Sequence, residues 1–316
     1  MNVRKNKILV AIDFGAESMN ALEHSYALAR VFDAELLLLY VLESSGVLGK
    51  LRSPEEYEKK IIDTAREKFD ELEELAKSTQ DKSQIKTSFL IQKGKPYQRI
   101  IETAYEYSVL LIVIGKNNAT ETAPRRRFAG SNSLNVVREA PCPVITIKSK
   151  AREPGKFQNI LLPLDFTKQT KKQVQKAIEI GGYFGARINI LSILRKDNKV
   201  IQLLKQVQLK QIKNAVQKQG IQCYTDFVFA RDGVVADIVL QHSKRINADL
   251  IIIMTQQKKK FVHYYIGSTA QALISESTIP VMSIIPIAEF KPGMVTTLVD
   301  PMGLIQKQKE ADSGEL

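Results

Sequence analysis

The chain has 316 residues, of which 44% are hydrophobic and 25% charged, with 46 Lys and Arg against 34 Asp and Glu. This composition is typical of a packed globular protein and excludes a disordered chain. At about 100–200 residues per domain, the length predicts two domains. The longest apolar run, residues 36–42, is too short for a membrane-spanning helix, and the apolar run after the basic N-terminus is too short for a secretory signal. We therefore expect a soluble, cytoplasmic protein.

The positive charge is unevenly distributed along the chain. Residues 1–150 carry a net charge of +3, residues 151–286 of +11 and residues 287–316 of −2, so the excess belongs to the second half. Cys142 and Cys223 lie 81 positions apart, a spacing that predicts neither a disulfide framework nor a metal site.

The chain contains an internal repeat. A short apolar run ends in Asp13-Phe14, and a similar run ends in Asp165-Phe166, 152 positions later. Gly130-Ser131 and Gly267-Ser268 also match, at an offset of 137 positions. The chain is therefore a tandem duplication whose second copy is shorter by about fifteen residues.

Each copy alternates between continuous apolar runs and amphipathic stretches. In the first copy we expect strands near residues 8–12, 35–42, 85–92, 109–115 and 143–148, and a long helix that starts at Ser53-Pro54. Continuous apolar runs are typical of parallel strands that are buried on both faces. Ser followed by Pro is a helix-start signature.

This order of elements predicts an α/β fold. We expect two Rossmann-like domains, each a doubly wound, five-stranded parallel sheet with helices on both faces. The domains are expected at residues 1–150 and 151–287, with a polar linker at residues 151–156 and a C-terminal extension at residues 288–316. The extension has no counterpart in the first copy; the sequence leaves open whether it covers a sheet edge or reaches a second chain.

An open parallel sheet binds its ligand outside the carboxyl ends of its strands, where the strand order reverses. The features that fall there are Asp13, the loop from Gly115 and Gly130-Ser131 in the first copy, and Asp165, the loop from Thr255 and Gly267-Ser268 in the second. A Gly-Ser pair at a helix start offers backbone N–H groups and the positive end of the helix dipole to a phosphate. The same pair also serves as a plain helix cap.

These features together resemble the universal stress protein family. The resemblance rests on the Asp after the first strand, the apolar fourth strand that runs into Gly115, the Gly-Ser pair before a helix, and the ending Ala140-Pro141-Cys142-Pro143-Val144. It implies a stress-response protein whose two domains pair within the chain. One branch of the family binds ATP or AMP through a loop of Gly, two residues, Gly, nine residues and Gly-Ser or Gly-Thr; another branch lacks the loop and binds no nucleotide.

The resemblance also implies roles for individual residues. Asp13 and the strand end near Val41 would face adenine and ribose, and Gly115, Asn118, Gly130 and Ser131 would lie near the phosphates. Both copies depart from the binding pattern, however. In the first, Asn118 replaces the second glycine and eleven residues precede Gly130.

In the second copy the departure is larger. Thr255 and Lys258 stand in place of the two glycines, and only eight residues precede Gly267. Side chains of this size keep backbone N–H groups away from a phosphate chain. We therefore expect the better site in the first copy, and a degenerate one, with Asp165, Gly267 and Ser268, in the second.

Each loop carries a basic triplet, Arg125–Arg127 in the first copy and Lys258–Lys260 in the second. Either these loops are simply exposed and charged, or the triplets bind a phosphate, a protein or a polyanion in place of the missing glycines. His263 lies among aromatic residues, a mixture that fits either single-stranded nucleic acid or docking of the loop on the neighbouring domain.

The sequence contains no recognisable catalytic constellation. His24 and His242 are expected at or near the surface, and Cys142 and Cys223 in the core. There is no Ser/His/Asp set, metal-ligand cluster or Walker-type loop. We therefore expect no enzyme and no metal.

Three functions remain. The first is a stress protein that responds to an adenine nucleotide; the second is an interaction or scaffold protein that binds no nucleotide and uses its basic surface. A weak ATP hydrolase is the third, and nothing in the sequence supports it. A homodimer stays open as an alternative, and no membrane partner is expected.

Overall fold

The computed structural model describes residues 6–43, 54–116, 132–148, 153–166, 170–194, 199–230, 234–255 and 266–284. The first copy contains β1 (Asn6–Ile12), α1 (Ala16–Phe32), β2 (Ala34–Glu43), α2 (Pro54–Ser78), α3 (Gln80–Ser83), β3 (Thr87–Gly94), α4 (Pro96–Glu106), β4 (Leu111–Gly115), α5 (Asn132–Glu139) and β5 (Val144–Ile147). The second contains β6 (Asn159–Leu164), α6 (Thr170–Phe184), β7 (Arg187–Leu194), α7 (Lys199–Gln217), β8 (Cys223–Phe229), α8 (Val235–Arg245), β9 (Leu250–Met254), α9 (Ser268–Glu276) and β10 (Val281–Ile284).

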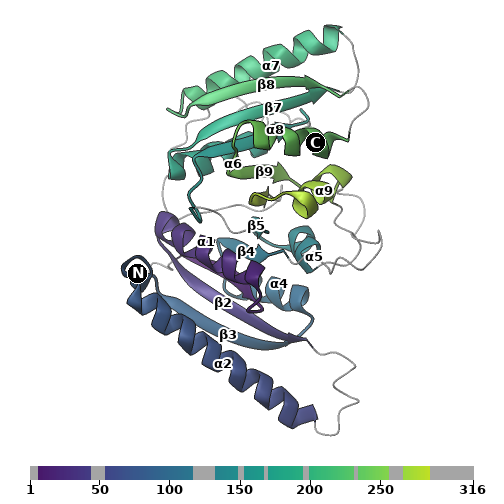
Figure 1. Cartoon of the computed structure of the whole chain (residues 1–316). Helices are drawn as coiled ribbons and strands as arrows, with labels where there is room; N and C mark the ends of the chain where they lie inside the picture. The colour runs from purple at the N-terminus through teal and green to yellow at the C-terminus, as the bar shows by residue number, and fades with distance from the viewer. Residues whose placement is uncertain are drawn as a thin grey trace, which may run out of the picture.

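The ten strands form one sheet in the order β3-β2-β1-β4-β5-β10-β9-β6-β7-β8 (Figure 1). Neighbouring strands are parallel within each copy, as continuous apolar runs predict. In each copy the strand order reverses on either side of the first strand, which is the arrangement of a doubly wound fold. The predicted fold class is confirmed.

Helices cover both faces of this sheet. Successive residues of β1 point to opposite faces: Val10 packs with α1 and α2 in one core, and Leu9 packs with α4 and α5 in the other. The second copy repeats this arrangement, with α6 and α7 on the first face and α8 and α9 on the second. Cys142 and Cys223 are buried, as predicted, and burial raises the pKa of each thiol.

The two copies join through β5 and β10, the one antiparallel pair of the described sheet. Ile145 lies opposite Met282, and both strands are buried along their whole length. Next to this junction α1 and α6 meet through aromatic rings: the ring centroid of Phe32 lies 5.0 Å from that of Tyr183 and 5.9 Å from that of Phe184. The sheet and one helix layer are thus continuous across the copies.

The end of the linker packs against α1. Gly155 has a φ of +69°, and a Cβ added to it would lie 2.5 Å from Cβ of Ala27, so only glycine fits. Its N–H donates to Nδ1 of His24 over 2.8 Å, and the His24 ring stacks on Phe157 at 6.2 Å. The expectation that His24 lies near the surface is wrong, because this side chain is 2% exposed and holds the linker.

No described helix is both long and apolar enough to cross a membrane.

The second copy is shorter mainly around its long helix: α7 has 19 residues against 25 in α2, and α3 has no counterpart in residues 218–222. In the first copy α3 lies on α1, where Asp81 pairs with Arg30 at 3.1 Å and Lys82 with Glu23 at 2.7 Å.

The burial of His24 predicts a pH dependence of stability. Burial lowers its pKa from 6.5 to about 4, so the unfolded chain binds a proton between these pH values that the folded chain does not. The free energy of unfolding should therefore fall by up to about 3 kcal/mol as the pH drops from 6.5 to 4. The measurement is urea unfolding across this range. In His24→Asn, which keeps an acceptor for the Gly155 N–H, this component of the pH dependence should be absent; an identical pH profile would contradict the assignment.

Candidate functional site

The carboxyl ends of β1, β2 and β4 bring together three of the predicted site residues. Ile12, the last residue of β1, pairs with Tyr40, so that Asp13 and Val41 are the next residues on adjacent strands. Ala11 pairs with Ile114, which places Gly115 beside the end of β1 on its other side. These strand ends lie at the reversal of strand order, where ligands bind in this class of fold.

Asp13 is exposed and lies just before α1, whose N-cap is Gly15. Its Oδ1 accepts hydrogen bonds from the N–H of Gly15 at 2.8 Å and from the hydroxyl of Ser18 at 2.5 Å. The Ser18 hydroxyl is also 3.3 Å from the N–H of Asp13. The sequence does not single out Ser18, although an Asp that accepts from the N–H two residues further on is a common turn signal.

The residue after this Asp has a left-handed backbone in both copies. Phe14 has a φ of 62° and Phe166 of 56°, a conformation that costs energy in a residue with a side chain. The Phe14 ring packs on Tyr40 and Phe69, and Lys68 lies 5.0 Å from its centroid. The Phe166 ring has Lys205 at 4.2 Å. The repeated Asp-Phe pair therefore forms the same turn twice.

Gly115 is required by packing. A Cβ at this position would lie 2.5 Å from the carbonyl carbon of Glu17 and from the nitrogen of Ser18. The end of β4 thus touches the backbone of the first turn of α1, to which Asp13 is tied through the Ser18 hydroxyl. Gly115 fixes the geometry of the strand end whether or not a ligand is bound.

The expected match between Thr255 and Gly115 is wrong by one residue. Gly115 pairs with Ile147 of β5, and the equivalent partner of Ile284 in β10 is Met254. Thr255 corresponds to Lys116: their N–H groups donate to Ile284 and Ile147 respectively. The second copy therefore carries a half-buried methionine at the position of the glycine.

The second copy also differs at the reversal of strand order. β6 and β9 pair over two residues, whereas β1 and β4 pair over four. Beyond this point Gln173 of α6 donates from Nε2 to the carbonyls of Pro163 at 3.0 Å and Ile252 at 3.2 Å. Ala21 occupies the matching position of α1. An amide side chain thus bridges β6 and β9 where the first copy has continuous sheet.

Gly267 and Ser268 open α9, as predicted. Gly267 is the N-cap, no side chain caps the helix, and a Cβ on Gly267 would meet nothing within 4 Å. Asp165 is exposed at the end of β6. Asn118, Gly130, Ser131, Arg125–Arg127, Lys258–Lys260, His263 and the extension 288–316 lie outside the described residues.

Lys116 is a buried cation that the sequence did not single out. The residue is 8% exposed, and its Nζ has no hydrogen-bond partner in the described part of the chain. Burial lowers the pKa of this amine to about 8. The positive charge of Lys148 also lowers this pKa, whereas the negative charge of Glu276, in the other copy, raises it. Lys116 follows Gly115 directly in the sequence, so its amine places positive charge just beyond the carboxyl end of β4.

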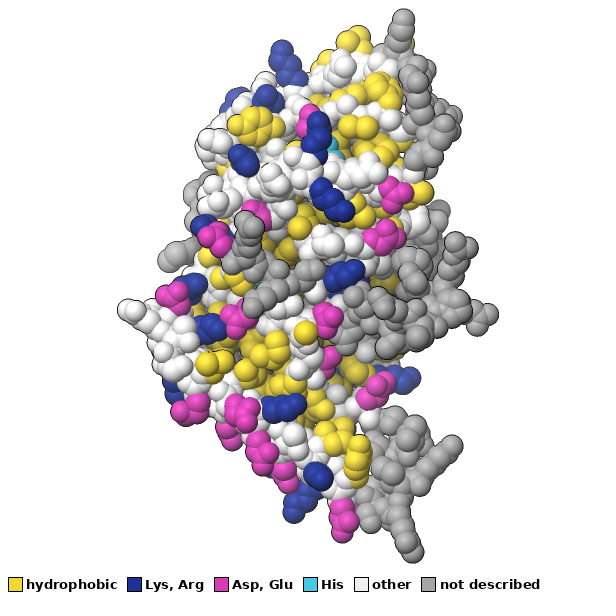
Figure 2. Space-filling view, viewed as in Figure 1, with side chains coloured by type: hydrophobic (Ala, Val, Ile, Leu, Met, Phe, Trp, Pro, Cys, Tyr) yellow, Lys and Arg dark blue, Asp and Glu magenta, His cyan; other side chains and the backbone are white. Residues whose placement is uncertain are grey.

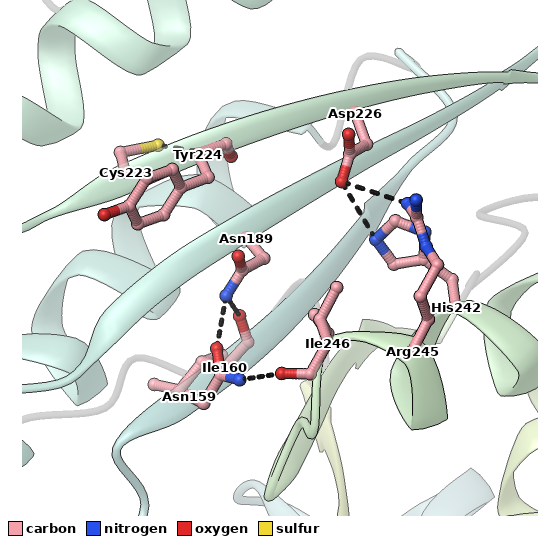
Figure 3. Close-up of polar contacts among 9 residues, drawn as sticks. All are labelled: Asn159, Ile160, Asn189, Cys223, Tyr224, Asp226, His242, Arg245 and Ile246. Carbon is pink, nitrogen blue, oxygen red and sulfur yellow. Dashed lines mark hydrogen bonds and ion pairs between the residues drawn. The ribbon is translucent and has the colours of Figure 1, made fainter.

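A second polar cluster lies between β8 and α8 (Figure 3). His242 is 5% exposed, so its expected surface position is also wrong. Its Nε2 lies 3.2 Å from Oδ2 of Asp226, and Arg245 contacts both residues. Burial and Arg245 lower the pKa of His242. The neighbouring Ser243 hydroxyl donates to Leu240 within the helix, so this cluster ties α8 to β8 and does not form a nucleophile–base pair.

The contacts of Asn159 and Asn189 in Figure 3 anchor the amino-terminal ends of β6 and β7. Buried Asn189 donates to the Asn159 side chain, which donates in turn to the carbonyls of Ile246 and Asn247. A cavity of about 550 Å³ opens at this same edge of the second copy. Its lining includes Gly181, Gly182, Gly185, Arg187, Gly220 and Gln222. Because it lies away from the carboxyl ends of the strands, it is separate from the candidate site.

Comparison with known proteins gives a consistent result. The model of the universal stress protein family matches residues 5–148 and again residues 156–284. A universal stress protein of Methanocaldococcus jannaschii is 28% identical over 148 residues, which cover 46% of this chain and 84% of the relative. One of Bacillus subtilis is also 28% identical over 148 residues, covering 45% and 99% respectively. A solved universal stress protein of Archaeoglobus fulgidus matches the fold with a TM-score of 0.71 at 20% identity, over 90% of this chain and 99% of its own.

The two site glycines should respond differently to alanine. Gly115→Ala should lower the free energy of unfolding by about 2–4 kcal/mol, because its Cβ would overlap the backbone of α1. The matched change Gly267→Ala should cost less than about 1 kcal/mol, since that Cβ enters open space. Urea unfolding monitored by circular dichroism measures both. Equal losses of unfolding free energy in the two variants would contradict the close approach of β4 to the backbone of α1.

Proposed function

The chain belongs to the universal stress protein family, and on this premise we propose that its first copy binds an adenine nucleotide. The observation that carries the proposal is the meeting of Asp13, Val41 and Gly115 at the carboxyl ends of three adjacent strands. In this arrangement the Asp13 carboxylate and the backbone of Val41 face the base and ribose. The phosphates extend toward Gly115, Asn118, Gly130 and Ser131.

The charge of this region supports a phosphate-bearing ligand. The Lys116 amine is buried without a partner in the described residues, and a phosphate oxygen would supply the hydrogen bonds that it lacks. The start of α5 at Asn132 directly follows Gly130-Ser131, so the positive end of a helix dipole lies at the end of the loop. Asn118 tolerates the backbone conformations that the glycine of the family pattern provides.

The second copy supports nucleotide binding less well. Met254 stands where the first copy has Gly115, and Gln173 bridges the strands at the matching position. We propose that the second copy serves as the structural partner of the first, with Asp165, Gly267 and Ser268 as remnants of a site. On this proposal one nucleotide binds per chain.

The proposed role is that of a cytoplasmic stress-response protein that binds a nucleotide and does not turn it over. A binding protein couples nucleotide level to partner contacts because a ligand stabilises the state that binds it. The interaction protein that binds no nucleotide is the alternative, and a titration separates the two.

Isothermal titration of the full chain with ATP and AMP tests the proposal. We expect saturation at one site per chain and a rise in the unfolding temperature at saturating ligand. Asp13→Asn keeps an oxygen for the Gly15 N–H and the Ser18 hydroxyl but replaces a ligand acceptor by an NH₂ group, so affinity should fall about tenfold. The matched control Asp165→Asn, in the second copy, should leave affinity unchanged. Absence of binding at millimolar ATP and AMP would refute the nucleotide site.

A further inference from the structure

The helix α7 presents a row of large apolar side chains to solvent. Val200 is 67% exposed, Leu203 64%, Leu204 60% and Val207 50%. These four residues, the α7 stripe, are spaced at i, i+3, i+4 and i+7 and so lie along one side of the helix. Isolated exposed apolar residues are ordinary, but an aligned group of four marks an interaction surface.

The α7 stripe is not a displaced part of the core. The core side of α7 is formed by Leu209, Ile212 and Val216, which are at most 8% exposed. Lys205 turns inward to the Phe166 ring. The amino-terminal half of α7 therefore has one side on the domain and a second, apolar side that is largely exposed.

Charge separates α7 from the corresponding helix of the first copy. α7 contains four lysines and no acidic residue, whereas α2 contains nine acidic and five basic residues. Figure 2 shows mostly acidic side chains along the end of the molecule that α2 occupies, and mostly basic and apolar side chains at the end that α7 occupies. Lys210 is exposed and Lys213 half-buried beyond the α7 stripe.

The surface around α7 is also apolar. Phe229, at the end of β8, the strand on which α7 packs, is 41% exposed. Figure 1 shows α7 as the outermost element at this end of the molecule. The surface is thus a projecting helix with an apolar centre and cationic neighbours.

These properties distinguish between the candidate occupants. Pairing with α7 of a second copy would bring lysines together without an acidic residue to offset them. Docking on α2 of a second copy would satisfy the charges, but α2 offers only Tyr57 and Leu75 as exposed large apolar residues. A membrane interface with anionic lipids accepts a projecting apolar helix and attracts lysines, and it needs no complementary groove.

We propose that α7 docks this protein on the surface of an anionic phospholipid bilayer. The α7 stripe enters the boundary between headgroups and acyl chains, and Lys210, which is exposed one turn beyond the stripe, lies beside the lipid phosphates. The sequence-based expectation of no membrane partner considered only helices that span a bilayer. A helix that lies in the interface needs one apolar side and basic neighbours, which α7 has.

The absence of tryptophan from the chain allows a sensitive test. Leu203→Trp introduces a single tryptophan in the α7 stripe of the full-length protein, and this side chain can be excited without exciting the tyrosines. With vesicles of phosphatidylcholine and phosphatidylglycerol in equal parts, its emission should shift to shorter wavelength. With vesicles of phosphatidylcholine alone the emission should stay unchanged. No shift with either kind of vesicle would overturn the proposal.

Co-sedimentation of vesicles with variants assigns the surface. The double variant Leu203→Gln, Leu204→Gln should bind the anionic vesicles at least about tenfold more weakly, with an unchanged thermal midpoint because both side chains are already exposed. The matched control Leu75→Gln, an exposed leucine of acidic α2, should bind like the natural chain. A double variant that binds normally would contradict the assignment. So would a natural chain that is dimeric by analytical ultracentrifugation and becomes monomeric on the double change, because a second copy would then be the occupant.

Discussion

The antiparallel pairing of β5 with β10 is the interaction on which the architecture depends. Each of these strands would be an exposed edge if its copy folded alone, and each consists of four buried residues. An exposed apolar edge favours uncontrolled association, so pairing within one chain removes this hazard for both copies together. The docked linker and the aromatic contacts between α1 and α6 reinforce the same junction. Although β5 and β10 are antiparallel, Figure 1 shows the outer strands of both copies pointing to the same side of the molecule, because the twist of the sheet accumulates between them.

On this common framework the two copies have diverged where ligands would bind. The first retains the close contact of Gly115 with α1 and a continuous β1–β4 pair. The second has Met254 at that position and a glutamine amide between β6 and β9. The turn formed by Asp-Phe is nevertheless the same in both, down to the left-handed backbone of the phenylalanine. The turn belongs to the fold, whereas the surroundings of the strand ends determine whether a ligand fits.

The sequence predicts the elements well because their signals are local or periodic. Continuous apolar runs, the Ser-Pro helix start and the repeat itself lead directly to the sheet and its helices. The predictions for His24 and His242 fail because their burial depends on partners distant in the chain, Gly155 and Asp226. The match of Thr255 to Gly115 fails because an apolar run shows where a strand lies but not its register against the next strand. Gln173, Lys116 and the α7 stripe also escape notice, since side-chain burial and exposure follow from packing across elements that spacing alone does not reveal.

The docking of Gly155 against α1 has a consequence for the evolution of the chain. Because the linker is itself packed on α1, it holds the two copies in one fixed arrangement, and the chain is selected as a single structural unit. A ligand site in the first copy then needs from the second copy only the strand β10, which pairs with β5 in the shared sheet. The second copy has Met254 at the position of Gly115 and a basic α7 with an apolar stripe, yet its strand β10 still completes the shared sheet. Two copies within one chain can therefore carry different surfaces, which two identical subunits of a homodimer cannot.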